Sequence, residues 1–402
     1  MRILIALTYY RPHYSGLTIY AEHEARALVA RGHQVTVLTS RFDPALPERE
    51  VRDGVEVIRP KVWFHISKGV IMPSMPIWAW RLVRQADIVH LHVPQLDAVL
   101  ISTFSRLQHK PVVLTYHCDL RLPKGLVHHV ANRVSDLANA ITATLADIVA
   151  TNTRDYAESS PFLRRYLHKL VPIFPPVQVE QISASDREAF RRKFNILPGH
   201  QIIGIAARLA TEKGVEHLAR ALPIVLERYP NARVLFVGPY QNVVGEEQYA
   251  RKIMALIEPL GGHWSFLGVV SPVEMSAFFH ESEVFVLPSQ NSTESFGMVQ
   301  VEALACGAPL IASNLPGMRV PVQMTGSGLL VPPANPGELA RALIAVLDEP
   351  GRYRGQPEKL VSLSTPENVA QEYEKLFELV RDRKLLQAKL ATMADHPIDP
   401  TL

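Results

Sequence analysis

Short apolar runs rich in β-branched residues alternate with longer amphipathic stretches along almost the whole chain. In the first half, the apolar runs predict strands at residues 2–8, 34–40, 55–59, 87–93, 111–116, 147–151 and 170–174. Stretches with helical spacing predict helices at residues 16–30, 95–109, 125–146 and 154–166.

The second half repeats the alternation. Strands are predicted at residues 201–207, 233–238, 264–268, 284–288, 309–313 and 328–331. Helices are predicted at residues 215–229, 246–260, 272–280, 297–305 and 336–347. Strands that are apolar on both faces need helices on both sides, so the pattern predicts an α/β protein with parallel sheets.

The alternation is interrupted once, at the proline-rich segment 171–177 (VPIFPPV). The interruption predicts two Rossmann-like, doubly wound domains, residues 1–175 and 176–365. A helix over residues 366–390 is free to cross back to the first domain. Ligands of such sheets bind at the carboxyl ends of the strands, so two facing domains predict a deep cleft between them.

Composition supports a globular protein of 402 residues, with 47% hydrophobic and 20% charged residues. The apolar N-terminus, MRILIALTYY, lacks the basic region and cleavage site of a signal peptide and predicts a first strand. Only two cysteines are present, Cys118 and Cys306, which fits a reducing cytoplasm and disfavours disulfides or a cysteine zinc site.

Charge is distributed unevenly. Residues 1–180 carry 21 basic and 15 acidic side chains, although the whole chain has a net charge of only +3. A basic first half favours an anionic partner, either a phosphate-bearing acceptor or an anionic membrane face; scattered solvated charges are the alternative. The small net charge and the lack of a recognition motif argue against nucleic-acid binding.

Two loops after predicted strands carry candidate chemistry. Arg208 and Lys213 lie between a strand and a helix that starts near Val215. Two cations beside a helix N-terminus suit a diphosphate, and the alternative is two surface charges in a turn.

The second loop leads into the segment TESFGMVQVEALACG. Glu294 lies in the loop and Glu302 one to two turns into the next helix, so both could face one ligand rich in hydroxyl groups. Backbone N–H groups at the start of this helix are expected to point at the same ligand, and their residues are Gly297, Met298 and Val299. The alternative is a capping acid and a solvated glutamate.

Candidate residues of the first domain follow its strands. Gly16 begins the first predicted helix. His117 and Asp119 follow the strand at 111–116, which would place them at the cleft rim on the acceptor side, with His117 as an acid/base or hydrogen-bonding group. His90 and His92 share one face of a strand. Because no carboxylate or cysteine stands at ligand spacing from them, we predict that they are packing or cleft-wall residues and that they form no metal site.

These motifs resemble those of the retaining glycosyltransferases of family 4. The resemblance lies in the Glu294–Glu302 pair with Ser-Phe-Gly inside it, the sequence EALACGAP from Glu302, and the sequence GIAARLATEKG at 204–214. Gly16, His117 and the segment 327–333 match in order, so nearly the whole chain is covered. The resemblance implies the GT-B fold, with the active site between two facing domains.

By position, the resemblance implies that Arg208 and Lys213 bind the diphosphate of a nucleotide sugar and stabilise the leaving group. Glu302 would bind the ribose and Glu294 the transferred sugar. His117 would lie beside that sugar and the acceptor. The remaining donor contacts would be made by Gly16, Val269, Phe296, Gly297, Met298 and Val299.

No Asp-x-Asp sequence occurs, which is consistent with a metal-independent enzyme that needs no cofactor. Ser15-Gly16 replaces the two adjacent glycines frequent in the family, and this leaves donor and acceptor identity open. The expected chemistry is transfer from a UDP- or GDP-linked sugar to a hydroxyl group with retention of configuration. The alternatives are a nucleotide-sugar epimerase, a phosphorylase, or a binding protein without activity.

Two stretches mix aromatic or aliphatic residues with basic ones, 61–84 and 121–134. Such mixtures suit an interfacial surface, as in family members that act on lipid-linked sugars, so we predict a cytoplasmic enzyme peripheral to the inner membrane face. The alternative is an amphipathic segment that packs on its own domain.

Overall fold

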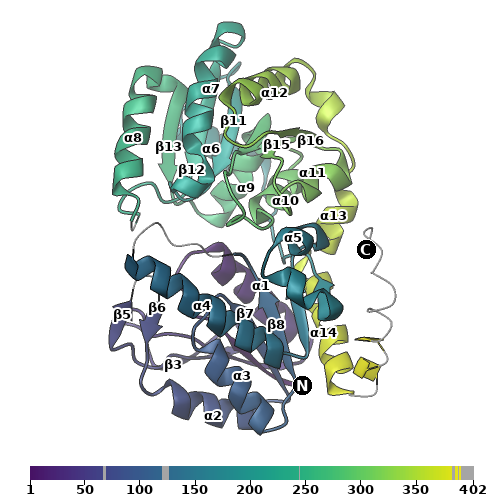
Figure 1. Cartoon of the computed structure of the whole chain (residues 1–402). Helices are drawn as coiled ribbons and strands as arrows, with labels where there is room; N and C mark the ends of the chain where they lie inside the picture. The colour runs from purple at the N-terminus through teal and green to yellow at the C-terminus, as the bar shows by residue number, and fades with distance from the viewer. Residues whose placement is uncertain (67–68, 120–125, 244, 383–384, 388, 391–402) are drawn as a thin grey trace. The chain divides into compact units, whose positions relative to one another are not determined.

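The structure is a computed structural model. It describes residues 1–402 except 67–68, 120–125, 244, 383–384, 388 and 391–402, and it leaves the side chains of 65–66 and 126–132 undescribed. The chain forms two compact units (Figure 1). Unit 1 contains Met1–Pro176 and Ser364–Leu402, and unit 2 contains Val177–Leu363.

The sheet of unit 1 has the strand order β10-β9-β8-β7-β1-β2-β4-β3. All neighbours are parallel except β3 and β4, and Ile3 of the central strand lies opposite Val35 and Ile88. The bounds are β1 Arg2–Ala6, β2 Gln34–Leu38, β3 Arg49–Arg52, β4 Val55–Ile58, β7 Ile88–Val93, β8 Val112–Tyr116, β9 Ile148–Thr151 and β10 Leu170–Pro172. A separate antiparallel pair consists of β5 (Phe64–Ile66) and β6 (Gly69–Ile71).

Two groups of helices pack on this sheet (Figure 1). One group is α2 (Met75–Gln85), α3 (Ala98–Leu107) and α4 (Leu126–Leu145), which contact one another in that order. The other is α1 (Gly16–Ala30) with α14 (Pro366–Arg381). Because side chains alternate along a strand, β7 sends Val89, Leu91 and Val93 into the first core and the two intervening histidines to the other face.

Helix α14 is fixed to unit 1 by buried polar contacts. The hydroxyl of Tyr373 lies 2.6 Å from that of Tyr20 on α1 and 2.8 Å from Oγ1 of Thr115 on β8. At the edge, Glu374 pairs with Arg31 and His33. The C-terminal helix therefore completes the unit formed by the first 176 residues.

Unit 2 has a six-stranded sheet, entirely parallel, in the order β13-β12-β11-β14-β15-β16. The strands are β11 Gln201–Ala206, β12 Ala232–Val237, β13 Trp264–Gly268, β14 Val284–Leu287, β15 Leu310–Ser313 and β16 Gly328–Val331. Helices α7 (Val215–Arg228), α8 (Glu247–Ile257) and α12 (Pro336–Asp348) form one packed group. The others are α6 Ala184–Lys193, α9 Pro272–Glu281, α10 Met298–Ala305, α11 Val320–Thr325 and α13 Glu358–Leu363.

Some elements differ from the sequence predictions. The helix predicted at 154–166 is divided at Pro161 into α5 (Arg154–Ser159) and a 3₁₀ helix, Leu163–Lys169, because proline cannot continue the helical hydrogen bonds. The helix predicted over 366–390 is described as α14 only to Arg381. Helices α2, α6, α11 and α13 and strands β3, β5 and β6 were not predicted. No helix in the described parts of the chain is both long and apolar enough to cross a membrane.

Candidate active site

In unit 2, the loops that follow β11 and β14 are joined side by side. These strands are neighbours in the sheet. The backbone N–H of Gln290 donates to the carbonyl of Glu212 at 2.9 Å, and its side-chain amide donates to the carbonyl of Thr211 at 3.1 Å. The two loops are therefore held together at the carboxyl edge of the sheet, where parallel α/β sheets bind ligands.

Gly214 permits this close approach. It has a left-handed backbone, φ 63°, at the start of α7, and a Cβ atom there would lie 2.2 Å from the carbonyl oxygen of Pro288. Any other residue would push the two loops apart.

Replacing Gly214 by alanine is therefore expected to destabilise unit 2 more than the same change at Gly199. Gly199 also has a positive φ, 88°, but no atom lies within 4 Å of a Cβ built there. The left-handed backbone costs alanine about 1 kcal/mol at each position, and only Gly214→Ala adds a backbone clash. Urea unfolding of both variants tests this, and equal midpoints would contradict the close contact.

The joined loops bring the predicted cations next to carboxylates. The Nζ of Lys213 forms an ion pair with Oε2 of Glu294, 81 positions away in sequence. The guanidinium of Arg208 lies 2.9 Å from Oε1 of Glu212, and the Arg208 side chain is 41% exposed. Lys213, Arg208 and Glu294 thus lie in one loop cluster. Glu212 compensates the charge of Arg208 locally.

Gly297 is the N-cap of α10, with φ 77°. A Cβ there would lie 2.5 Å from Cδ2 of Leu287, so glycine lets the helix begin against the end of β14. The N–H groups of Met298 and Val299 belong to the first turn, which helix geometry leaves without acceptors inside the helix. The Phe296 side chain is buried, so only its backbone is placed to meet a ligand.

Glu302 lies one turn further along α10 and is partly buried. Burial raises the pKa of its carboxyl group to about 7. Among the described residues, its side chain has no hydrogen-bond or ion-pair partner. Val269, the residue after β13, is exposed.

In unit 1, Gly16 is the first residue of α1, and Ser15 caps the helix by accepting a hydrogen bond from the Thr18 N–H at 3.2 Å. His117 follows β8 directly and is buried, with Nε2 2.9 Å from Nδ1 of His92. Burial, reinforced by the neighbouring His92, holds the pKa of His117 well below its usual value and favours the neutral imidazole.

Asp119 is buried beside this strand end and is held by hydroxyl groups of its own unit. Its Oδ1 accepts hydrogen bonds from the Tyr116 hydroxyl and the Ser160 hydroxyl, each at 2.8 Å. Its backbone N–H donates to the Tyr156 hydroxyl at 2.7 Å. The Asp119 carboxylate thus has a clear structural role in addition to its predicted place on the acceptor side.

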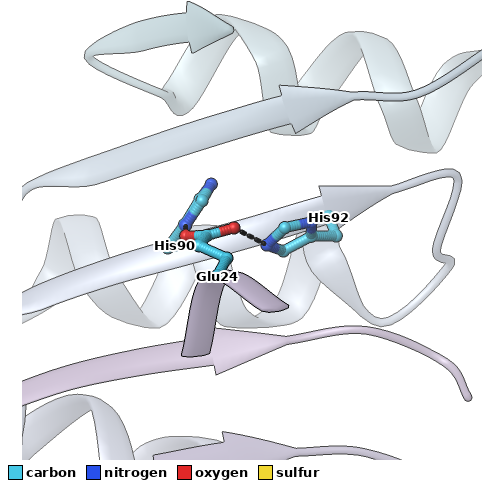
Figure 2. Close-up of side chains that lie close together, drawn as sticks. All are labelled: Glu24, His90 and His92. Atoms are coloured by element: carbon cyan, nitrogen blue, oxygen red, sulfur yellow. Dashed lines mark ion pairs between the residues drawn. The ribbon is translucent and has the colours of Figure 1, made fainter. Parts of the chain in front are cut away.

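The expectation that His90 and His92 lack a carboxylate partner was wrong. Figure 2 shows Glu24 projecting from α1 toward both rings. Its Oε1 lies 2.8 Å from Nδ1 of His90, and its Oε2 lies 3.4 Å from Nε2 of His92. Burial alone would raise the pKa of Glu24, but the two histidines lower it to about 2.

Sequence reasoning also missed Glu212 and Gln290, which hold the loops of unit 2. Their positions could have identified them, because both residues lie in loops that follow predicted strands. Glu24 had no such signal, because it lies inside the helix α1 and meets the histidines only when that helix covers the sheet.

Two family models match the chain. Residues 15–173 match a glycosyl transferase 4-like domain, and residues 186–361 match the glycosyl transferases group 1. A D-inositol 3-phosphate glycosyltransferase of Streptomyces bingchenggensis is 30% identical over 367 residues, covering 84% of this chain and 78% of that protein. A phosphatidyl-myo-inositol mannosyltransferase of Mycobacterium leprae is 28% identical over 332 residues, covering 80% and 81%.

Solved structures share the fold. Sucrose-phosphate synthase from Thermosynechococcus elongatus superimposes with a TM-score of 0.72 at 23% identity, covering 96% of this chain and 99% of that one. HepE of Anabaena, in complex with UDP and glucose, gives 0.71 at 17% identity, covering 94% and 99%. These matches and the two parallel sheets confirm the predicted fold and family: the chain belongs to the group 1 glycosyltransferases of family 4 and has the GT-B fold.

Proposed function

We propose that this glycosyltransferase transfers a sugar from a UDP- or GDP-linked donor to a hydroxyl acceptor, with retention of configuration and without a metal ion at the leaving group. The observation that carries the proposal is the loop cluster of unit 2, where Lys213, Arg208 and Glu294 meet at the carboxyl edge of the sheet. The structure of HepE with UDP and glucose supports a nucleotide-sugar donor.

Lys213 and Arg208 would bind the donor diphosphate, and their fixed positive charge would stabilise the charge that develops on the leaving group. Glu294 would hold Lys213 in place and accept hydrogen bonds from the transferred sugar. Glu302 would accept hydrogen bonds from the ribose hydroxyls. The N–H groups at Phe296–Val299 would contact sugar and phosphate, and Val269 would contact the base through its backbone.

The reaction breaks the bond between the anomeric carbon and the diphosphate oxygen and forms a bond from that carbon to the acceptor oxygen on the same face. The acceptor proton passes to the departing diphosphate, so no protein group has to take it up. The residues of unit 2 then act by positioning and electrostatic stabilisation. Unit 1 would bind the acceptor, with Asp119 and the neutral imidazole of His117 on that side. Gly16 would let the first helix of that unit approach the donor phosphate.

A lipid-linked or cell-envelope acceptor is favoured by the surface of unit 1. Helix α2 buries Met75, Ala79, Leu82 and Val83, so part of the stretch 61–84 packs on its own domain. Other apolar side chains of this stretch remain exposed beside exposed basic residues; they are Trp63 (70%), Phe64, Ile77 and Trp80, with Lys61, Arg81 and Arg84. The name of the Mycobacterium leprae relative also refers to a lipid acceptor.

The second predicted stretch, 121–134, lies mostly outside the described side chains. Its described continuation on α4 exposes Val134, Leu137 and Ile141 at helical spacing. We propose that these surfaces bring the enzyme to the inner, cytoplasmic face of an anionic membrane, where apolar insertion and basic charge act together.

The double variant Trp63→Ser/Phe64→Ser is expected to lose most binding to vesicles that contain phosphatidylglycerol, because it removes the exposed aromatic anchors. Co-sedimentation with such vesicles and with neutral ones measures the loss. Leu197→Ser, which changes a side chain of unit 2 that is about as exposed as Phe64, is the control. Equal binding by the wild type to both vesicle types, or equal loss in the control, would rule out this surface.

The proposed function is tested by release of nucleoside diphosphate from UDP-, GDP- and ADP-sugars, with and without a lipid extract. Release from one donor, raised by lipid, would identify the donor and support a lipid acceptor. The configuration of the product, read by NMR, decides retention. Binding of a donor without release would favour a binding protein, and conversion of the donor sugar without transfer would favour an epimerase.

A further inference from the structure

Unit 1 contains a buried cluster that the proposed sugar transfer does not require. Glu24 on α1 and His90 and His92 on β7 are all fully buried, and one ligand-type atom from each lies within 4.8 Å of the others (Figure 2). The cluster is enclosed by α14, since the rings of Tyr373 and Phe377 lie 4.7 Å and 5.6 Å from the ring of His90.

The atoms that face one another in this cluster have no hydrogen-bond partners. They are both carboxylate oxygens of Glu24, Nδ1 of His90 and Nε2 of His92. The Glu24 carboxylate lies at short distance from both rings, but these contacts do not have hydrogen-bond geometry. Burying four polar atoms without a hydrogen bond is costly even where a carboxylate lies beside imidazole rings, and a cation between them would coordinate them directly.

The opposite ring nitrogens, by contrast, are both engaged. Nε2 of His90 lies 2.7 Å from Oγ1 of Thr115, and Nδ1 of His92 lies 2.9 Å from Nε2 of His117. The Thr115 hydroxyl is in turn 2.8 Å from the hydroxyl of Tyr373. Histidines that bind metals commonly show this division, with one nitrogen on the ion and the other oriented by a neighbour.

We propose that Glu24, His90 and His92 bind a divalent transition-metal ion of the Zn²⁺ class. Two imidazole nitrogens and one carboxylate form an N/O ligand set that Zn²⁺ accepts, and a small molecule such as water would complete the coordination. The ligands of the ion all belong to unit 1, whereas the residues proposed to bind the diphosphate belong to unit 2. Because the ligands come from α1 and β7, the ion would tie that helix to the sheet.

The ion would also set the tautomer of His117. With its Nε2 on a metal, neutral His92 carries its proton on Nδ1 and donates it toward Nε2 of His117. His117 then accepts at Nε2 and carries its own proton on Nδ1. The relevance of this tautomer to the acceptor rests on the role proposed for His117, whereas the metal site itself does not.

The test uses the full chain with any affinity tag removed. Elemental analysis after gel filtration is expected to find about one Zn²⁺ per chain, or the chelator-treated protein is expected to take up about one Zn²⁺ or Co²⁺. Bound Co²⁺ adds visible absorption bands that report nitrogen and oxygen ligands. Added Zn²⁺ is expected to raise the Tm of the stripped protein in a concentration-dependent way.

Glu24→Gln is expected to abolish metal uptake while keeping the volume of the side chain. His33→Gln is the matched control, because His33 also pairs with a glutamate, Glu374, but this pair is not part of a three-ligand cluster among the described residues. If Glu24→Gln does not fold, the Co²⁺ spectrum of the wild type decides. A wild type that holds no metal and shows neither Co²⁺ bands nor a Tm response would overturn the proposal and leave a metal-free ion pair, whatever the outcome for sugar transfer.

Discussion

Replacing Lys213 by alanine is expected to lower kcat for donor turnover by about 10²–10³-fold, the usual effect of removing one preorganised group that stabilises developing charge. Lys213 lies in the joined loops of unit 2 and is only 20% exposed, so its ammonium group is partly shielded from water. In that setting we expect it to act on the leaving diphosphate more strongly than a surface lysine would. Steady-state release of nucleoside diphosphate measures the effect.

The same substitution is expected to change stability little, because exposed or partly exposed ion pairs contribute about 0–1 kcal/mol. Lys193→Ala is the matched control, since Lys193 also pairs with a glutamate of unit 2, Glu274, but is 58% exposed on α6. Both variants should unfold at similar urea concentrations, and only Lys213→Ala should lose turnover. Full turnover in Lys213→Ala would remove the phosphate-binding role from the proposal.

Most of the fold could be predicted because each buried strand is recognisable from its own short apolar run in the sequence. The strands predicted at 264–268 and 328–331 have the same bounds in the structure. Buried parallel strands are short apolar runs, and the amphipathic helices between them are easy to distinguish. The family resemblance then identified the fold that joins two such sheets.

The elements that were not predicted have little apolar pattern. Helix α6 is strongly charged and buries only Phe190. Its one local signal was the capping pair Ser183 and Asp186, which the structure shows as a reciprocal capping box. Strand β3 is four residues, Arg49–Arg52, without a buried side chain, and it pairs antiparallel with β4.

The sequence predicted those candidate site residues that lie in loops directly after strands. It did not predict the contacts of residues inside helices. The rule that ligands bind at the carboxyl edge of a parallel sheet pointed to the loops of Lys213 and Glu294, which the structure brings into contact. Glu24 and the two histidines meet through helix-to-sheet packing. That contact depends on which face α1 covers, and no local spacing encodes it.

Glu302→Gln is expected to weaken donor binding by about 10–100-fold, since hydrogen bonds to a charged group contribute about 1.5–3 kcal/mol. In the wild type, the Glu302 carboxylate has no partner among the described residues. Burial raises its pKa from 4.5 to about 7, so near neutral pH the free enzyme is a mixture of protonated and ionised forms. Ribose hydroxyls would donate to the ionised form, so donor binding should select it.

Two pH dependences follow. For the wild type, kcat/KM for the donor should fall as pH falls below about 7, because this parameter reports ionisations of the free enzyme. The glutamine variant should lack this acidic limb. Glu283→Gln is the matched control, because burial also raises the pKa of Glu283 in the same unit. An acidic limb that persists in Glu302→Gln would assign it to another group.

The free energy of unfolding should depend on the same ionisation in the opposite sense: the ionised form of Glu302 favours donor binding, whereas the protonated form favours the folded state. Because the folded pKa of Glu302 lies above its unfolded value, its contribution to stability is complete below about pH 4.5 and is lost as pH rises through about 7. The difference in Tm between Glu302→Gln and wild type should therefore increase from pH 4.5 to pH 7, in favour of the variant, and then level off. A constant difference would mean that the carboxyl group titrates normally. The increase would show that this enzyme keeps an unpartnered carboxylate at a cost in stability, as expected of a group whose partner is the substrate.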